Sequence, residues 1–170
     1  MRRFLFITGI LIPVIILAGC GNNTLANDEH LMLDFKSNVD IKSDEIQMNA
    51  NITRDKSGTT SLEVTSPETL KGLVFDHSST ENSISKDGLS YKTDAVVLPN
   101  SSVVVSIMDA LDCMSEMEEE KPFYKDDKEM AFIGKIDVGK FEVRADRKTG
   151  FIKEIKIGEK ITASFSKQGS

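Results

Sequence analysis

Apolar and polar residues alternate with a period of two along most of the chain, which is typical of strands with one buried face. The clearest case is the segment 46–52, where apolar Ile46, Met48, Ala50 and Ile52 alternate with polar residues. Similar segments lie at 31–41, 62–64, 70–75, 84–91, 130–138, 141–145, 152–157 and 161–165. Because Met32 interrupts the first of these, residues 31–35 also fit one or two turns of helix. Counting the hairpin within 84–91 as two strands, the pattern predicts about nine or ten strands.

One segment changes period and predicts a helix over residues 101–117. It follows Pro99-Asn100-Ser101, which supplies a capping residue, and it ends before Pro122. Its apolar residues recur every three or four positions and form one stripe: Val103, Val104, Ile107, Met108, Leu111 and Met114.

Short turns connect the predicted strands, and Asp87-Gly88 is the strongest hairpin signal among them. Neighbours joined by short turns pair antiparallel, and so long a sheet curls. We therefore predict a mainly β (α+β) fold, a curved antiparallel half-barrel of about 9–10 strands. Its concave face needs a cover, and the helix at 101–117 is the amphipathic helix available for it.

The N-terminal segment has the order of a secretory leader. Two arginines precede an uncharged apolar run at 4–17, which is shorter than the roughly 20 residues of a spanning helix. The run closes with Leu17-Ala18-Gly19-Cys20, which resembles the lipobox of bacterial lipoproteins. The resemblance implies cleavage of a signal peptide at 1–19 and a lipid, palmitate included, on Cys20. It implies an anchor at the extracytoplasmic face of the cell membrane, or at the outer membrane of a two-membrane cell.

The remaining chain is organised simply and is acidic. We expect a flexible tether at 20–30, a single domain at 31–166 and a tail at 167–170. Without the leader the net charge is about −8, compared with −6 for the whole chain, which argues against a nucleic-acid partner. With Cys20 lipidated, Cys113 has no intramolecular partner, and we expect an inert, buried thiol and a monomer.

No constellation for catalysis is convincing, so we predict that the protein is not an enzyme and uses no cofactor. Ser83-x-x-Lys86 and Lys148-Thr149-Gly150 match serine–lysine motifs of penicillin-binding enzymes, but the first lies beside a hairpin turn and the second forms a turn. The histidines, His30 and His77, are expected to be solvated loop residues without a nucleophile or zinc partners. The acidic residues Glu116 to Glu120, with Asp126 and Asp127, lack the spacing of a calcium loop, so no metal site is predicted.

The order of elements also resembles a bacterial superfamily. The resemblance begins with Phe35, Val39 and Ile41 in the first predicted strand. Three later stretches carry it further: Ser66-Pro67-Glu68-x-Leu70-Lys71-Gly72-Leu73-x-Phe75, Asp87-Gly88-Leu89-x-Tyr91, and Phe141-x-Val143-x-x-Asp146-x-x-x-Gly150. They look like the half-barrel superfamily of lipoprotein carriers, outer-membrane lipoprotein receptors and lipid-carrying lipoproteins. The resemblance implies an apolar cavity between sheet and helix that takes acyl chains. The residues expected to line it are Val104, Ile107, Met108, Leu111, Met48, Phe75 and Phe141.

Two functions remain open at this point, and a hydrolase is the weakest third. The first is a membrane-anchored carrier or receptor that binds a lipid or acyl chain in the half-barrel. The second is a non-enzymatic envelope interaction or sensor lipoprotein with a solid core and a protein partner. The absence of Trp and the presence of only two Tyr favour a small cavity or none. The volume left between the helix and the sheet distinguishes the two functions, because a carrier needs a cavity there and an interaction module does not.

Overall fold

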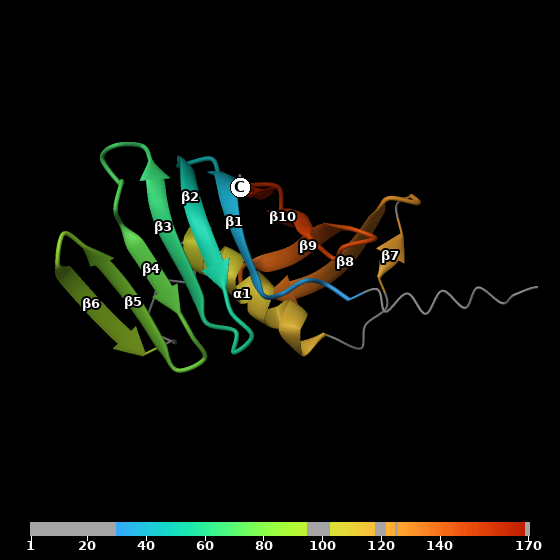
Figure 1. The fold of residues 1–170 in the computed structure, drawn as a ribbon, viewed down its shortest axis with the longest axis horizontal. Helices are drawn as coiled ribbons and strands as arrows, with labels where there is room; N and C mark the ends of the chain where they lie inside the picture. The colour runs from blue at the N-terminus through green and yellow to red at the C-terminus, as the bar shows by residue number, and fades with distance from the viewer. Residues whose placement is uncertain (1–29, 95–102, 118–121, 125, 169–170) are drawn as a thin grey trace, which may run out of the picture.

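A single curved sheet with one helix packed against it makes up the fold (Figure 1). The computed structural model describes residues 30–94, 103–117, 122–124 and 126–168. In these ranges the helix is α1 (Val103–Glu116), and the sheet has eleven antiparallel strands. The strands are β1 (Phe35–Lys42), β2 (Gln47–Arg54), β3 (Thr60–Ser66), β4 (Val74–His77), β5 (Glu81–Lys86), β6 (Leu89–Asp94), β7 (Phe123–Tyr124), β8 (Glu129–Ile136), β9 (Gly139–Asp146), β10 (Ile152–Ile157) and β11 (Ile161–Lys167).

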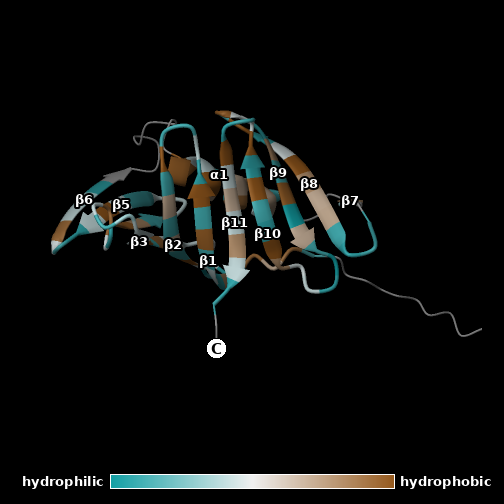
Figure 2. Cartoon of the chain, turned by 90° about the horizontal axis from the view of Figure 1, so that it is seen from above, coloured by the Kyte–Doolittle hydropathy of each residue, from teal (hydrophilic) through white to brown (hydrophobic). Residues whose placement is uncertain are grey.

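The chain begins and ends in the middle of the sheet. The strand order is β6-β5-β4-β3-β2-β1-β11-β10-β9-β8-β7, so β1 pairs with β11. The first six strands therefore lead outward to one edge, and the last five return inward from the other. Helix α1 belongs to the connection between the two edges and crosses one face of the sheet on the way (Figures 1 and 2).

The sheet wraps around the helix. Helix α1 contacts β4 on one side and β8 and β10 on the other. Six strands lie between β4 and β8 in the sheet, so a flat sheet could not bring both to one helix. The predicted arrangement, a curved antiparallel sheet with a helix on its concave face, is confirmed.

The period-two pattern assigns the faces correctly. Val39 of β1 lies opposite Ala50 of β2 and Phe165 of β11, and all three side chains are buried against α1 and its neighbours. Ser37 is the polar exception on this face. Its hydroxyl donates to the carbonyl oxygen of Ser166 at 2.7 Å, which satisfies a polar group that would otherwise be costly to bury.

Several element boundaries differ from the prediction. Strand β1 begins at Phe35, because Leu31 to Leu33 pack on the core as an irregular strap instead of pairing. The Met32 amide donates to the carbonyl oxygen of Gly150 at 2.9 Å, and this holds the strap to the turn after β9. Residues 67–72 form a turn closed by Gly72 at φ +78°, so β4 begins at Val74 instead of residue 70.

Other differences are smaller. Strand β7 was not predicted, since two residues are too few to show a period. Lys167 belongs to β11 instead of a tail. Gly134 of β8 lies under the Phe141 ring, which a Cβ at this position would collide with. The leader, Cys20 and most of the predicted tether, together with Glu118–Glu120, lie outside the described residues.

Candidate functional site

Six of the seven residues predicted to line a cavity are buried in one core. They are Val104, Ile107, Met108 and Leu111 of α1, Met48 of β2 and Phe141 of β9. Ile107 and Leu111 have 0% exposed surface, so neither borders a space that admits a water molecule. A ligand could reach them only by displacing α1, and their contact with a ligand stays a prediction.

Phe75, the seventh, is only partly buried and leads to the open end of the sheet. On the concave face it pairs across strands with Leu62 of β3 and Ile84 of β5, and Ile84 pairs with Tyr91 of β6. We call Leu62, Phe75, Ile84 and Tyr91 the apolar row. Its members become more exposed outward, from 0% at Leu62 to 63% at Tyr91, because the strands extend beyond α1.

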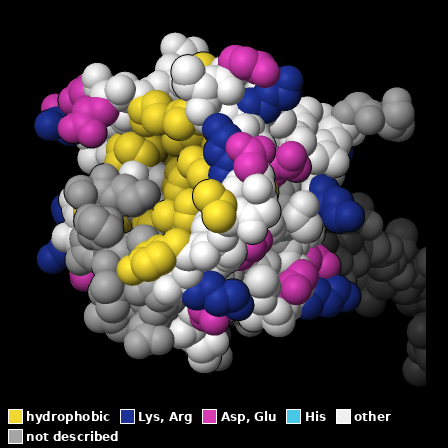
Figure 3. All heavy atoms as spheres, turned by 90° about the vertical axis from the view of Figure 1, so that its left-hand side faces the viewer, with side chains coloured by type: hydrophobic (Ala, Val, Ile, Leu, Met, Phe, Trp, Pro, Cys, Tyr) yellow, Lys and Arg dark blue, Asp and Glu magenta, His cyan; other side chains and the backbone are white. Residues whose placement is uncertain are grey.

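The apolar row forms part of a larger apolar surface. Figure 3 views this end of the molecule and shows apolar side chains gathered in one area, with charged residues around part of it. Leu89 of β6, the most exposed large apolar residue described, lies next to Tyr91 on the same face. Contiguous apolar surface of this kind usually marks a binding site or an interface.

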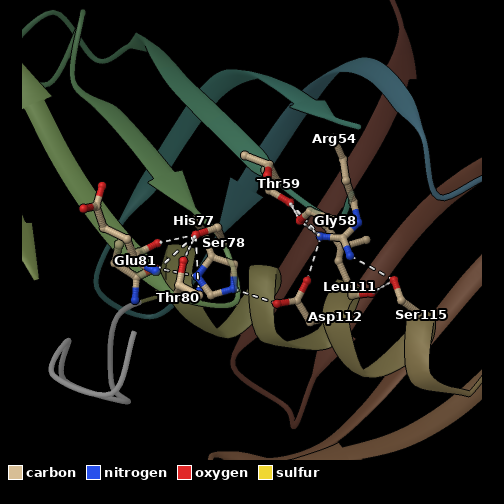
Figure 4. Close-up of polar contacts among 12 residues, drawn as sticks. Arg54, Gly58, Thr59, His77, Ser78, Thr80, Glu81, Leu111, Asp112 and Ser115 are labelled. Atoms are coloured by element: carbon tan, nitrogen blue, oxygen red, sulfur yellow. Dashed lines mark hydrogen bonds and ion pairs between the residues drawn. The ribbon is translucent and has the colours of Figure 1, made fainter. Parts of the chain in front are cut away.

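A polar network borders the apolar row and joins α1 to the sheet (Figure 4). We use the term for Arg54 of β2, His77 of β4, Asn82 of β5 and Asp112 of α1. His77 follows Phe75 by two residues on the same face, and Asn82 precedes Ile84 by two. The His77 Nε2 lies 2.8 Å from Asp112 Oδ2, and its Nδ1 lies within hydrogen-bond distance of Asn82 Oδ1.

Arg54 gives the network its fixed positive charge. Its Nη1 donates to Asp112 Oδ1 at 2.7 Å, to Thr60 Oγ1 at 2.7 Å and to the Gly58 carbonyl oxygen at 2.8 Å. Its Nη2 donates to Ser115 Oγ at 2.9 Å. Among the described residues, its Nε is buried without a hydrogen-bond partner. A guanidinium with its charge paired and most of its donors satisfied is the form in which arginine tolerates burial.

The network shifts the acid–base equilibria of its members. The hydrogen bond to Asp112 raises the pKa of His77, and this outweighs the effect of burial. Burial acts to raise the pKa of Asp112, but hydrogen bonds from His77 and Arg54 bring it below its usual value. Because Asp112 and the Asn82 carbonyl are both acceptors, this geometry fits an imidazolium that donates from both nitrogens.

An open pocket of about 580 Å³ lies beside the polar network, and Arg54 is among the residues that line it. Leu31 and Leu33 of the strap, Asp112 and Ser115 of α1 and the turn after β2 line it. Its volume falls within the range of small-molecule sites. Four carboxylates and two cations border it, and we assign no ligand to it.

The remaining candidate motifs do not assemble into a site. Ser83 lies in β5, where its hydroxyl donates to Asp76, whereas Thr149 caps the turn before β10 by bonding Asp146. Strands β5 and β10 are far apart in the sheet order, so the two motifs do not meet. Among the residues that the structure describes, no group of three His, Cys, Asp or Glu could hold a metal. Cys113 is free and half-buried, and burial raises the pKa of its thiol.

The prediction for His77 was wrong, and the network as a whole was missed. His77 is buried in β4 instead of lying solvated in a loop, because β4 continues further than the apolar pattern shows. One signal could have revealed Arg54. It continues the inward parity of Met48, Ala50 and Ile52, so an arginine stands where the pattern expects a buried side chain. His30, by contrast, is exposed as expected.

Comparisons with known proteins found similarity only at the level of structure. No protein-family model and no curated protein sequence matches the chain. An uncharacterized conserved protein from Thermus thermophilus aligns at 8% identity and a TM-score of 0.47, over 81% of this chain and 82% of that one. A LolA superfamily protein from Nitrosomonas europaea aligns at 8% identity and a TM-score of 0.43, over 85% and 91% of the two chains. In the described ranges, no helix is long and apolar enough to cross a membrane.

Proposed function

We propose that the protein is an extracytoplasmic lipoprotein, anchored through Cys20, that binds one acyl chain of a lipid along the apolar row. The observation that carries the proposal is the rise in exposure from Leu62 to Tyr91 as the concave face emerges from beneath α1. The proposed binding surface therefore lies at the end of the half-barrel instead of under the helix.

The chemistry of the surface supports an apolar ligand. Phe75, Ile84 and Tyr91 point to the same side of three adjacent strands, and Leu89 extends the surface at the edge. Covering apolar surface contributes roughly 25 cal/mol per Å², so an acyl chain across several such side chains gains measurable affinity.

The proposed anchor keeps the surface near a source of such ligands. Residues 21–30 extend at most about 35 Å between the lipidated cysteine and the strap. A domain on a tether of this length stays close to the membrane surface, where acyl chains are abundant. Stable anchoring needs more than one acyl chain, which a fully modified Cys20 would supply.

Tyrosine fluorescence provides a direct test. The chain has no Trp and two Tyr, so Tyr124→Phe leaves Tyr91 as the single emitter. A fatty acid brominated near the middle of its chain should quench this emission, with saturation in the micromolar range. Ile84→Ser should weaken binding about tenfold or more, because it places a hydroxyl in the apolar row. Val74→Ser, a matched change on the opposite face of β4, should leave the affinity within about twofold.

The absence of saturable quenching would contradict the proposal. Native mass spectrometry of the purified protein provides an independent readout, because a lipid carrier should retain co-purifying lipid.

One observation favours the second function, an envelope interaction module. The space beneath α1 is filled by Ile107 and Leu111, both fully buried, so the protein offers a surface instead of an enclosed cavity. An open surface can bind the apolar side chains of a protein partner equally well. If this second function is correct, no lipid co-purifies, quenching of Tyr91 by the brominated fatty acid does not saturate, and Ile84→Ser disrupts an envelope complex.

A further inference from the structure

The polar network connects α1 to the strands that carry the outer part of the apolar row. Asp112 lies on α1, whereas His77 and Asn82 lie on β4 and β5. We call β4, β5 and β6 the arm. On its other side, α1 contacts β8 and β10 of the other half of the sheet and packs into the common apolar core. The arm ends in an edge strand, and its attachment to α1 includes this buried charged link.

We propose that His77 is a proton-controlled latch: as an imidazolium it holds the arm against α1, and as a neutral imidazole it lets the arm separate and exposes the covered inner end of the apolar row, near Leu62 and Phe75, to an acyl chain. This inference rests on the proposed function, since it names the regulation of that same surface. The latch itself can be tested without any ligand.

The geometry is built for the charged form. The two partners of the ring are the carboxylate Oδ2 of Asp112, at 2.8 Å from Nε2, and Oδ1 of Asn82, next to Nδ1. An imidazolium donates to both oxygens, whereas a neutral ring donates to one of them and carries a lone pair on its other nitrogen. Loss of the proton removes the charge attraction between His77 and Asp112, and the hydrogen bond to Asn82 is kept only if the amide turns its NH2 to the ring.

Among the described residues, the charges that act on the pKa of the ring are the carboxylates of α1. On α1, Asp112 and Asp109 both favour the imidazolium. On β5, Asn82 accepts from it, and the neighbouring Glu81 carboxylate is paired with Lys92 of β6 at 2.8 Å. On β3, Thr60 pairs with His77 in the sheet and binds Arg54 through its hydroxyl. Arg54 disfavours a second cation, but Asp112 lies between the two.

The sign of the pH dependence follows from these contacts. The pKa of His77 is raised above its ordinary value of 6.5 in the folded protein. Its contribution to closure is therefore fully present below pH 6.5 and is lost as the pH rises through the raised pKa. We expect the closed arm in acid and the open arm in mildly alkaline solution.

The test begins with the free protein. The chain has two histidines, so His30→Asn leaves His77 as the single imidazole for an NMR titration. Hydrogen–deuterium exchange of residues 81–94, corrected for the intrinsic pH dependence of exchange, should accelerate about tenfold as His77 loses its proton. In His77→Gln, which is neutral at every pH, the corrected rate should not change with pH. Exchange in β10 should stay constant in both proteins and serves as the internal control.

The second measurement adds a ligand whose charge does not change. A brominated lysophosphatidylcholine is zwitterionic across this range, so a change in its affinity reports on the protein. Binding to the Tyr124→Phe protein should tighten with rising pH and follow the NMR titration of His77, whereas binding to the His77→Gln version should be independent of pH.

The outcomes separate the latch from the proposed function. Accelerated exchange without any quenching would support the latch and contradict acyl-chain binding. Quenching that is equal at all pH values, together with constant exchange, would overturn the latch and leave the proposed function intact. Should His77→Gln fail to fold, the titration and exchange of the protein with His77 intact decide alone, since an unshifted His77 pKa or constant exchange rejects the latch.

Discussion

The carboxylate of Asp112 lies 2.7 Å from the guanidinium of Arg54, and the two side chains differ greatly in exposure. Arg54 is 2% exposed and Asp112 is 35% exposed. Loss of the pair would therefore cost Arg54 more than Asp112. Asp112 can bind water instead, whereas the buried charge of Arg54 cannot. The pair connects the end of β2 to the C-terminal half of α1 and fixes the helix relative to the sheet.

Removal of the Asp112 carboxylate should destabilise the protein. Asp112→Ala leaves the buried charge of Arg54 unpaired, and we expect a loss of about 2 kcal/mol or more in the free energy of unfolding. This is less than the roughly 3–5 kcal/mol of a fully buried pair, because solvent reaches Asp112. Urea denaturation measures the loss.

The matched control for this variant is Asp109→Asn, one turn earlier on α1. Burial raises the pKa of Asp109, so its charge is not stabilised by the fold, and the substitution should change stability by less than about 0.5 kcal/mol. Equal losses in the two variants would show that the Arg54–Asp112 pair has no special role.

Stability should vary with pH in two windows. Because the pKa of His77 is raised, its contribution is lost as the pH rises above 6.5 and through the folded value. Because the pKa of Asp112 is lowered, its contribution is lost as the pH falls below 3.8 and through the folded value. Thermal unfolding of the unmodified protein and of His77→Gln should therefore differ at about pH 5 and converge at about pH 9. A constant difference across this range would be inconsistent with the shifted histidine.

The packing beneath α1 predicts a large effect for Leu111→Ala. Leu111 has no exposed surface, so the substitution leaves a cavity, and we expect a cost of about 2–5 kcal/mol. Leu89→Ala is the matched control, because Leu89 is 79% exposed and its loss should cost less than about 0.5 kcal/mol. A small cost for Leu111 would reveal unfilled space under the helix that a ligand could occupy.

Lipidation on Cys20 is testable in cells. Cys20→Ala should abolish incorporation of labelled palmitate and release processed protein from the membrane fraction. Cys113→Ala should retain both properties, because Cys113 lies on α1 within the folded domain. Membrane retention of a correctly processed Cys20→Ala protein would rule out the lipid anchor.

The local pattern of the sequence was sufficient for most elements. The alternation in residues 46–52 assigned the buried face of β2, because a strand turns its side chains to opposite sides at every residue. The stripe from Val104 to Met114 assigned the buried face of α1 for the same kind of reason. The hairpin at Asp87-Gly88 was predictable because both residues adopt positive φ, which these residue types tolerate.

The candidate site was less predictable than the fold. Its apolar members appear in the pattern, but how exposed each one is depends on where α1 ends over the sheet. Phe75 and Met48 look alike in sequence, yet Met48 is buried and Phe75 is only partly so. The strap at Leu31 to Leu33 was misassigned because its apolar spacing fits a strand while its backbone bonds to Gly150.

The sequence by itself determined the faces of the strands, the single helix and the inward parity of Arg54, since these follow from local geometry. Only the tertiary structure decided that Arg54 meets Asp112 across 58 positions and that His77 meets it across 35. These contacts depend on the pairing of β1 with β11 and on the path of α1 across the concave face. The strand pairing and the path of the helix are both set by long-range packing. The charge of Arg54 can be buried only because this packing brings Asp112 to it, and no local sequence pattern identifies that partner.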